Sequence, residues 1–233
     1  MSVDNHQLSE SEFLQHYIQN ASHLMWFLGA GTSRSAGLPT ATDIIWDLKR
    51  RYYCLHENQD FQSHDVSNSA IKRKIQAYMD SKRFPALWSL EEYSFYFDVI
   101  FGTDDQAQQR YIHEALATGK VSLNMGHRGL AGLMEMGVAR IVFTTNFDEV
   151  MEAAFALVAG KNLSTYHLEG SYAALDALNG ERFPLYAKVH GDFRYQKIMN
   201  LTQDLLSNDR EIQKCFLAAS TRCGLVVSGY RGR

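Results

Sequence analysis

A short apolar run that stops at a glycine-rich turn constrains this chain more than any other feature. Residues 24–28 read Leu-Met-Trp-Phe-Leu, and the turn Gly29-Ala30-Gly31-Thr32-Ser33 follows directly. A run this short, rich in aromatic residues and ended by glycine, favours a buried strand. Pro39 and the apolar residues after it predict a helix. The order strand, turn, helix is the building unit of a parallel α/β sheet.

The same alternation returns in the second half of the chain. Apolar runs at 140–145, 185–189 and 225–228 predict further strands, the second alternating apolar and polar residues and the last one buried. Helical patterns begin at His127 and cover residues 147–159 and 211–221. Another helix is predicted near the N-terminus, where Ser9 and Glu12 fit a capping box. We therefore expect an α/β fold, a Rossmann-like, doubly wound parallel sheet.

The alternation is interrupted between the first two predicted strands. Residues 55–70 are polar and predict a surface loop, and helical periodicity then continues from Ile71 to Thr118. We expect a single domain over residues 1–233 with a helical insertion over 55–120. The segment Tyr93–Phe101 is dense in aromatic residues. It predicts a small core for the insertion, and a wall over a ligand pocket is the alternative.

Composition excludes several classes of protein. The chain has 233 residues, and 23 Lys and Arg against 26 Asp and Glu give a net charge of −3, without the basic excess typical of nucleic-acid binding. Three Cys residues are too few for a disulfide framework or a four-thiolate zinc site. The N-terminus lacks a signal sequence, and no apolar run is long enough for a membrane span. We expect a cytoplasmic protein.

Three polar clusters follow predicted strands. They are Gly29–Ser33, Thr144–Asp148 and His190–Asp192. Because the carboxyl ends of parallel strands meet at one edge, we expect a ligand site there. Each cluster also has a structural interpretation: a tight turn without a ligand, a helix cap at Asp148 and a structural histidine.

These clusters resemble the signature motifs of the sirtuin family, in order. The motifs are Gly29-Ala30-Gly31-Thr32-Ser33 with Gly37-Leu38-Pro39, then Thr145-Asn146-Phe147-Asp148, then His190-Gly191. The resemblance spans about residues 24–230. It implies a Rossmann-type domain with a smaller inserted module, and NAD+ bound across the sheet edge.

The resemblance also implies a role for each matching residue. The Gly29–Ser33 loop holds the pyrophosphate, Asn146 orients water and the nicotinamide ribose, Asp148 contacts the carboxamide, and His190 is the general base. Gly229 and Tyr230 border the adenosine half. The implied NAD+-binding residues are Gly29, Ala30, Gly31, Thr32, Ser33, Gly37, Pro39, Thr145, Asp148, Gly229 and Tyr230.

The chain departs from deacylating sirtuins in specific ways. Their four zinc-binding cysteines are missing, position 145 is Thr where Gln is usual, and Thr40-Ala41-Thr42 replaces their Phe-Arg. A helical insertion stands where the zinc module would be, so we expect no metal. This pattern is similar to the sirtuin-like domains of bacterial antiphage defence proteins, which hydrolyse NAD+. The ending Gly229-Tyr230-Arg231-Gly232-Arg233, where relatives continue, fits a fragment of a longer protein.

The leading hypothesis is a bacterial NAD+ glycohydrolase that releases nicotinamide and ADP-ribose and depletes NAD+ in antiphage defence. The alternatives are a zinc-free NAD-dependent protein deacylase and a non-enzymatic sensor of NAD+ or ADP-ribose. NAD+ is the expected substrate. We also expect a homo-oligomer and either a defence partner protein or a further C-terminal domain, with no nucleic-acid or membrane partner.

Overall fold

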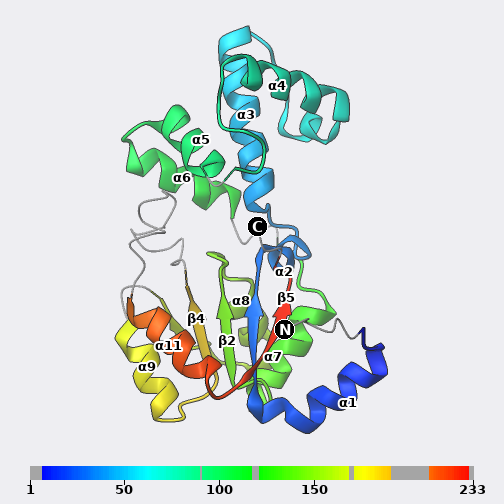
Figure 1. The fold of residues 1–233 in the computed structure, drawn as a ribbon, viewed down its shortest axis with the longest axis vertical. Helices are drawn as coiled ribbons and strands as arrows, with labels where there is room; N and C mark the ends of the chain where they lie inside the picture. The colour runs from blue at the N-terminus through cyan, green and yellow to red at the C-terminus, as the bar shows by residue number, and fades with distance from the viewer. Residues whose placement is uncertain (1–6, 90, 117–120, 168–170, 190–209, 231–233) are drawn as a thin grey trace, which may run out of the picture.

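The structure is a computed structural model that describes residues 7–89, 91–116, 121–167, 171–189 and 210–230. Figure 1 shows two parts stacked along the long axis. The lower part contains a sheet with helices packed on it. The upper part, here called the helical module, consists of α3, η2, α4, α5 and α6, and it lies beyond the edge at which the strands end.

The elements alternate as the sequence predicts outside the helical module. The strands are β1 (Leu24–Leu28), β2 (Ile141–Thr144), β3 (Thr165–Tyr166), β4 (Leu185–Lys188) and β5 (Gly224–Ser228). The helices of the α/β part are α1 (Glu10–Asn20), η1 (Ala21–His23), α2 (Ala30–Arg34), α7 (Met125–Glu135), α8 (Val150–Ala159), α9 (Ser171–Asn179) and α11 (Arg210–Ser220). Those of the helical module are α3 (Ala41–Glu57), η2 (Ser63–Ser67), α4 (Ser69–Ser81), α5 (Glu92–Phe101) and α6 (Asp105–Ala115).

The sheet has five strands in the order β3-β4-β2-β1-β5, and every pairing is parallel. Leu28 of β1 lies level with Thr144 of β2 and Ser228 of β5. From β1 the chain moves to one side of the sheet, and it returns to the other side of β1 only for β5. The direction of winding therefore switches between β1 and β5, where open α/β sheets form their ligand crevice.

Helices cover both faces of this sheet. On one face α7 and α8 pack over Val142 and Tyr186, and on the other α9 and α11 pack over Met25, Phe143 and Ala187. This arrangement confirms the predicted α/β fold with a doubly wound parallel sheet. The capping box at Ser9 is also present, since its hydroxyl accepts the Glu12 N–H and the Glu12 carboxylate accepts the Ser9 N–H.

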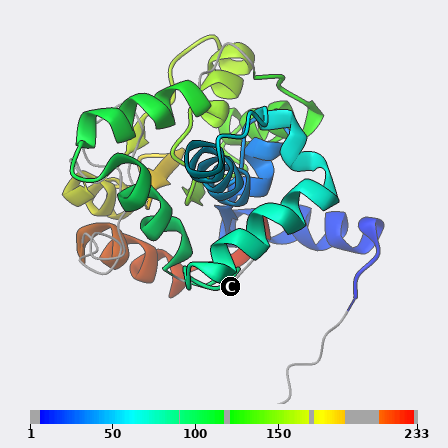
Figure 2. The ribbon, with the colours of Figure 1, turned by 90° about the horizontal axis from the view of Figure 1, so that it is seen from above.

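The helical module has a hydrophobic core of its own. Ile75, Met79, Tyr96 and Phe97 are fully buried in it, so the aromatic segment of α5 forms the predicted small core. Viewed from above, α3 is seen almost end-on near the centre of the molecule (Figure 2). Five of its residues belong to the same core, which places α3 in the module: Ile44, Ile45, Trp46, Leu48 and Tyr53.

The predicted surface loop over residues 55–70 is wrong at both ends. α3 continues to Glu57, where Asn58 ends it in the left-handed conformation. Residues 63–67 form η2, and Val66 is buried in the module core. The helical turn in this segment has five residues and one buried apolar residue, Val66. A stretch this short shows no hydrophobic periodicity, so the sequence did not predict it.

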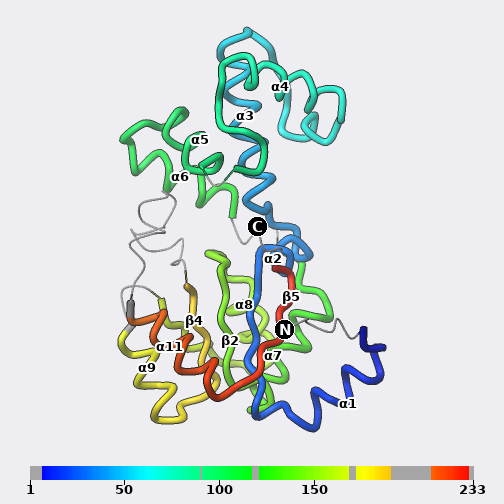
Figure 3. Tube along the Cα trace, viewed as in Figure 1, coloured from blue at the N-terminus to red at the C-terminus, as the bar shows by residue number. Residues whose placement is uncertain are grey.

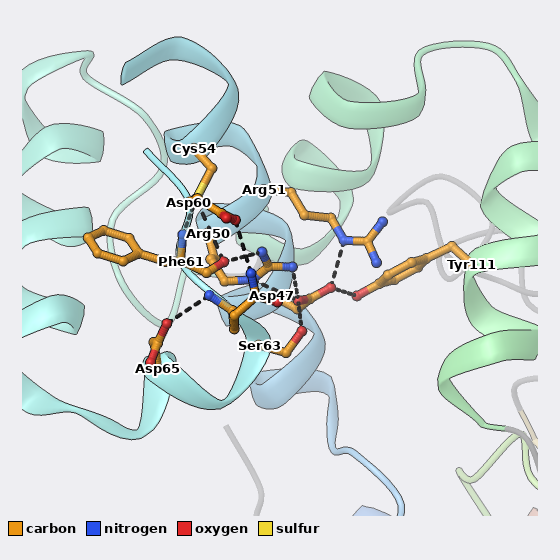
Figure 4. Close-up of polar contacts among 10 residues, drawn as sticks. Asp47, Arg50, Arg51, Cys54, Asp60, Phe61, Ser63, Asp65 and Tyr111 are labelled. Atoms are coloured by element: carbon orange, nitrogen blue, oxygen red, sulfur yellow. Dashed lines mark hydrogen bonds and ion pairs between the residues drawn. The ribbon is translucent and has the colours of Figure 1, made fainter. Parts of the chain in front are cut away.

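The side chain of Asp47 ties three elements of the module together (Figure 4). Its carboxylate accepts hydrogen bonds from Arg50 and Arg51 of α3, from Ser63 of η2 and from the Tyr111 hydroxyl of α6. Burial of the Asp47 carboxyl raises its pKa, but hydrogen bonds from Arg50 and the charge of Arg51 outweigh burial, so the pKa lies below its ordinary value. The carboxylate therefore stays ionised between its cations.

Strand β5 is not buried, contrary to the prediction. It forms one edge of the described sheet and pairs only with β1. Leu225 and Val227 are 47% and 50% exposed. An apolar run indicates a strand but not its position in the sheet, and position determines how much of the strand is covered.

Candidate functional site

The glycine-rich turn lies where β1 meets β5 and begins the short helix α2. Gly29 is the N-terminal cap residue of α2, so residues 30–33 are helical rather than an open loop. The Gly29 N–H donates to the Ser228 carbonyl at 2.9 Å, and the Gly31 N–H donates to the Gly229 carbonyl at 2.7 Å. The turn is thus fastened to the end of β5 through the backbone.

Close backbone approach explains why glycines occupy positions 29 and 31. A Cβ atom on Gly29 would lie 2.5 Å from the Tyr230 Cα, and one on Gly31 would lie 2.8 Å from the Gly229 carbonyl oxygen. The sequence suggested glycine for approach of a pyrophosphate. In the structure the neighbour is the chain's own segment Gly229–Tyr230. The amides of Gly29, Gly31 and Thr32 already have backbone acceptors, so few donors of this turn remain for a ligand.

Asn146 lies in the loop between β2 and α8 and reaches across to this turn. Its side-chain Nδ2 is within hydrogen-bond distance of the Gly29 carbonyl at 3.1 Å, of Thr32 Oγ1 at 3.0 Å and of Ser33 Oγ at 2.7 Å. The residue is only 8% exposed, and its backbone N–H donates to Thr144 Oγ1. Asn146 therefore joins the first and second motifs physically.

The partners of Asn146 fix which way its amide faces. The Gly29 carbonyl can only accept a hydrogen bond, so the atom that faces it must be the NH2 group. Within the described residues no partner contacts Oδ1. That oxygen is an acceptor left for a ligand, a water molecule or a ribose hydroxyl.

The neighbouring residues of the second motif have structural partners. Asp148 is buried, and its Oδ1 accepts the Val150 N–H at 3.0 Å, which caps the start of α8. The Thr145 N–H donates to the Leu28 carbonyl at 3.1 Å. Residues 147–149 precede α8, so the helix predicted from Phe147 begins three residues later. Asp148 thus has the cap contact that the sequence left open.

Lys188 is a buried residue of this region that the sequence reasoning missed. It is the last residue of β4, and its ammonium contacts the Asp148 carbonyl at 2.6 Å and the Glu152 carboxylate at 2.7 Å. The alternation over 185–189 indicated a strand but gave no sign that Lys188 is buried. In fact every residue of β4 is buried, because β4 is a central strand with helices on both faces.

His127 is a second residue that the sequence reasoning missed, and it contacts the glycine-rich turn from the start of α7. The ring of buried His127, at the start of α7, contacts the Thr32 carbonyl through Nε2 at 2.9 Å. Its Nδ1 accepts the Asn124 N–H, so Nε2 carries the proton and donates to Thr32. Asn124 also donates to Ser35 Oγ, the hydroxyl that follows α2. A capping asparagine three residues before a histidine was a detectable signal in the sequence.

One cavity borders the turn, and a second lies beyond the end of α2. One of about 770 Å³ is lined by Gly31, Thr32, Ser228 and Gly229 together with apolar residues of β1, α7 and α8. The other, about 700 Å³, lies between α3, η2 and α6 and includes Arg34 and Pro39. The first cavity adjoins the β1–β5 switch point and is large enough for part of a dinucleotide.

The remaining predicted residues are placed as follows. Gly37 has a φ of 97°, a conformation that favours glycine. Pro39 precedes Thr40, whose hydroxyl caps α3 through Asp43, so the proline lies outside the helix. Tyr230 is half exposed, and its ring packs edge-on against Phe27. His190 lies outside the described residues.

The described residues include one buried cysteine, Cys215, and two partly exposed ones, Cys54 and Cys223. They contain no group of three or more His, Cys, Asp or Glu side chains placed to hold a metal ion. Burial raises the pKa of the Cys215 thiol to about 11, so this cysteine is protonated at neutral pH. No helix in the described part of the chain is both long and apolar enough to cross a bilayer.

Comparison with known families agrees with the motifs. Residues 140–233 match the model of the SIR2-like domain, and this range contains the second and third motifs together with β5. No curated protein matches the chain. The parallel sheet and the contact between the first two motifs agree with this match, so the chain is similar to the SIR2-like domain over residues 140–233.

Proposed function

We propose that this protein is an NAD+ glycohydrolase, which uses water to release nicotinamide and leave ADP-ribose. The observation that carries the proposal is the arrangement of Asn146, whose Nδ2 is held by the glycine-rich turn while Oδ1 has no partner within the described residues. An acceptor fixed in this way can orient a water molecule or a ribose hydroxyl. The depletion of NAD+ in antiphage defence is the biological role we propose with it.

For this hydrolysis the protein mainly has to orient the attacking water and the ribose, because the leaving nicotinamide ring is already cationic. The bond between ribose C1′ and the nicotinamide nitrogen breaks, and the electron pair leaves with a ring that was already cationic. Water attacks C1′ through an oxocarbenium-like state and loses one proton. Asn146 Oδ1 orients the attacking water or the ribose, and His190 is proposed to accept the proton. A general base contributes about 10²–10⁴-fold to such a step.

The adenosine half is proposed to lie toward β5. The cavity of about 770 Å³ lined by Gly31, Thr32, Ser228 and Gly229 supports this orientation. The nicotinamide half then reaches the Asn146 side of the turn. Asp148 keeps its proposed contact with the carboxamide through the carboxylate oxygen that does not cap α8.

One assay tests the proposal against its alternatives. The protein is incubated with NAD+, and free nicotinamide is measured with and without an acetyl-lysine peptide. Release that does not depend on peptide supports hydrolysis. Release only with peptide supports deacylation, and saturable NAD+ binding without turnover supports a sensor. The variant His190→Ala should keep NAD+ affinity and lose about 10²–10⁴-fold in rate.

A further inference from the structure

Lys188 places a cation where a folded protein would normally avoid one. Its side chain is fully buried and lies beneath the first turn of α8. The amino end of a helix carries partial positive charge, so an ammonium there is unfavourable without compensation. Glu152, in the first turn of α8, supplies an opposite charge at 2.7 Å. Such a pair is expensive to bury, so a specific geometric role has to account for it.

The ammonium binds the loop as well as the carboxylate. It contacts the Asp148 carbonyl at 2.6 Å and the Phe147 carbonyl at 3.4 Å. These two residues directly follow Asn146. Thr144, which is level with Lys188 in the sheet, holds the Asn146 N–H from the other side. The loop is therefore fixed on both sides of Asn146, by a hydroxyl before it and by an ammonium after it.

We propose that Lys188 is a positioning residue for NAD+ hydrolysis, and this inference rests on the proposed function. By holding the carbonyls of residues 147 and 148, Lys188 keeps the Asn146 backbone in the one position from which Nδ2 reaches the turn and Oδ1 faces the substrate. Among the hydrogen bonds and ion pairs between described residues, none joins the Lys188 ammonium to the turn or to the Asn146 side chain. Its effect is on the rate of the chemical step rather than on NAD+ affinity, since small misplacement of a reacting group can cost about 10²-fold.

The test separates positioning from stability with a pair of substitutions. Lys188→Met alone removes the ammonium that the Glu152 carboxylate contacts at 2.7 Å, and the protein is expected to lose stability. Adding Glu152→Gln removes that charge and restores the melting temperature toward wild type. The loop carbonyls still lack the ammonium in the double variant, so the rate should stay low.

The matched control is the exposed pair Lys161–Glu135, joined at 2.9 Å near the other end of α8. Lys161→Met with Glu135→Gln makes the same chemical changes away from the site. We expect the Lys188→Met, Glu152→Gln variant to lose about 10- to 100-fold in kcat for nicotinamide release, with KM for NAD+ within about twofold. The control variant should match wild type in both constants.

Each outcome has a distinct meaning. A stable double variant that retains kcat within about twofold overturns the role of Lys188 and leaves the proposed hydrolysis standing. A rise in KM with unchanged kcat also overturns it, because the lysine would then serve binding. If wild-type protein releases no nicotinamide, the proposed function fails, and the role of Lys188 fails with it.

Discussion

The two polar atoms of the Asn146 side chain face different surroundings. Nδ2 is committed to the glycine-rich turn, and Oδ1 has no partner within the described residues. Oδ1 is not among the fully buried polar atoms that lack a partner, so water or a ligand can reach it. The unequal use of the amide therefore favours a role that combines fastening the turn with contacting a ligand.

Asn146→Ala is expected to lower the free energy of unfolding moderately and to lower kcat much more than the loss of stability explains. The lost hydrogen bonds should lower the free energy of unfolding by about 1–3 kcal/mol. Loss of an oriented acceptor should lower kcat by about 10²–10³-fold with little change in NAD+ affinity. Asn20→Ala is the control, since it removes a hydrogen bond from an asparagine side chain to a backbone carbonyl at the end of α1, away from the site. Turnover that falls only in proportion to stability in both variants would make Asn146 structural.

Gly31→Ala tests how closely the turn and β5 are packed. The added Cβ would lie 2.8 Å from the Gly229 carbonyl oxygen and 2.9 Å from its Cα, so the end of β5 must move. We expect a loss of about 1–3 kcal/mol in stability together with weaker NAD+ binding. Gly129→Ala is the opposite case, because open space surrounds this glycine of α7 and alanine should stabilise the helix by about 0.5–1 kcal/mol. Equal melting temperatures for the two variants would contradict the packing described.

At the scale of elements, strand type was easier to predict than strand environment. The apolar runs at 24–28 and 140–145 correspond to β1 and β2, and Gly160 ends α8 in the left-handed conformation as expected. β3, with two residues, is too short to produce a periodic pattern. The alternating run over 185–189 indicated a strand, and nothing in it distinguished a buried lysine from an exposed one. Only the position of β4 inside the sheet reveals that Lys188 is buried.

The helical module should depend on ionised Asp47. The pKa of Asp47 in the folded protein lies below its ordinary value, so its contribution to stability is complete above the unfolded pKa of about 3.9 and is lost as pH falls through the folded pKa. We expect Asp47→Asn to cost about 1–3 kcal/mol near neutral pH. Denaturant titrations should show this difference shrinking below about pH 4. Asp98→Asn, on the exposed face of α5, is the control and should change little at any pH.

At the scale of the whole molecule, the candidate site draws on segments far apart in sequence. The motifs alone predicted that Gly29–Ser33 and Asn146 would meet, because both follow parallel strands. They could not predict that Gly229 would occupy the space beside Gly31, since that contact depends on β5 lying next to β1. His127 and Lys188 were missed for the same reason. Each acts through a partner distant in the chain, and the one local signal, Asn124 three residues before His127, indicates a helix cap but not the contact with Thr32.

The protein is predicted to bind no structural zinc. Cys54 lies in the helical module, whereas Cys215 and Cys223 belong to the α/β part, and no cluster of ligands occurs among the described residues. Elemental analysis of purified protein should therefore find substoichiometric zinc, and a chelator should leave the melting temperature unchanged. Zinc bound at one equivalent and lost together with folding would disprove this.

The length of α3 has a mechanical consequence. The Cα trace shows this helix starting beside α2 and running to the far end of the molecule, with α4 packed at its tip (Figure 3). Seventeen helical residues span about 26 Å. Because a helix is stiff over this length and α3 packs in the module core, a tilt of α3 about its Thr40–Asp43 cap would carry the helical module with it. A tilt of about 10° moves the tip by about 4–5 Å and the base by far less. A force on the C-terminal end of α3 would therefore also act on the segment Gly37–Thr40, which lies next to the glycine-rich turn.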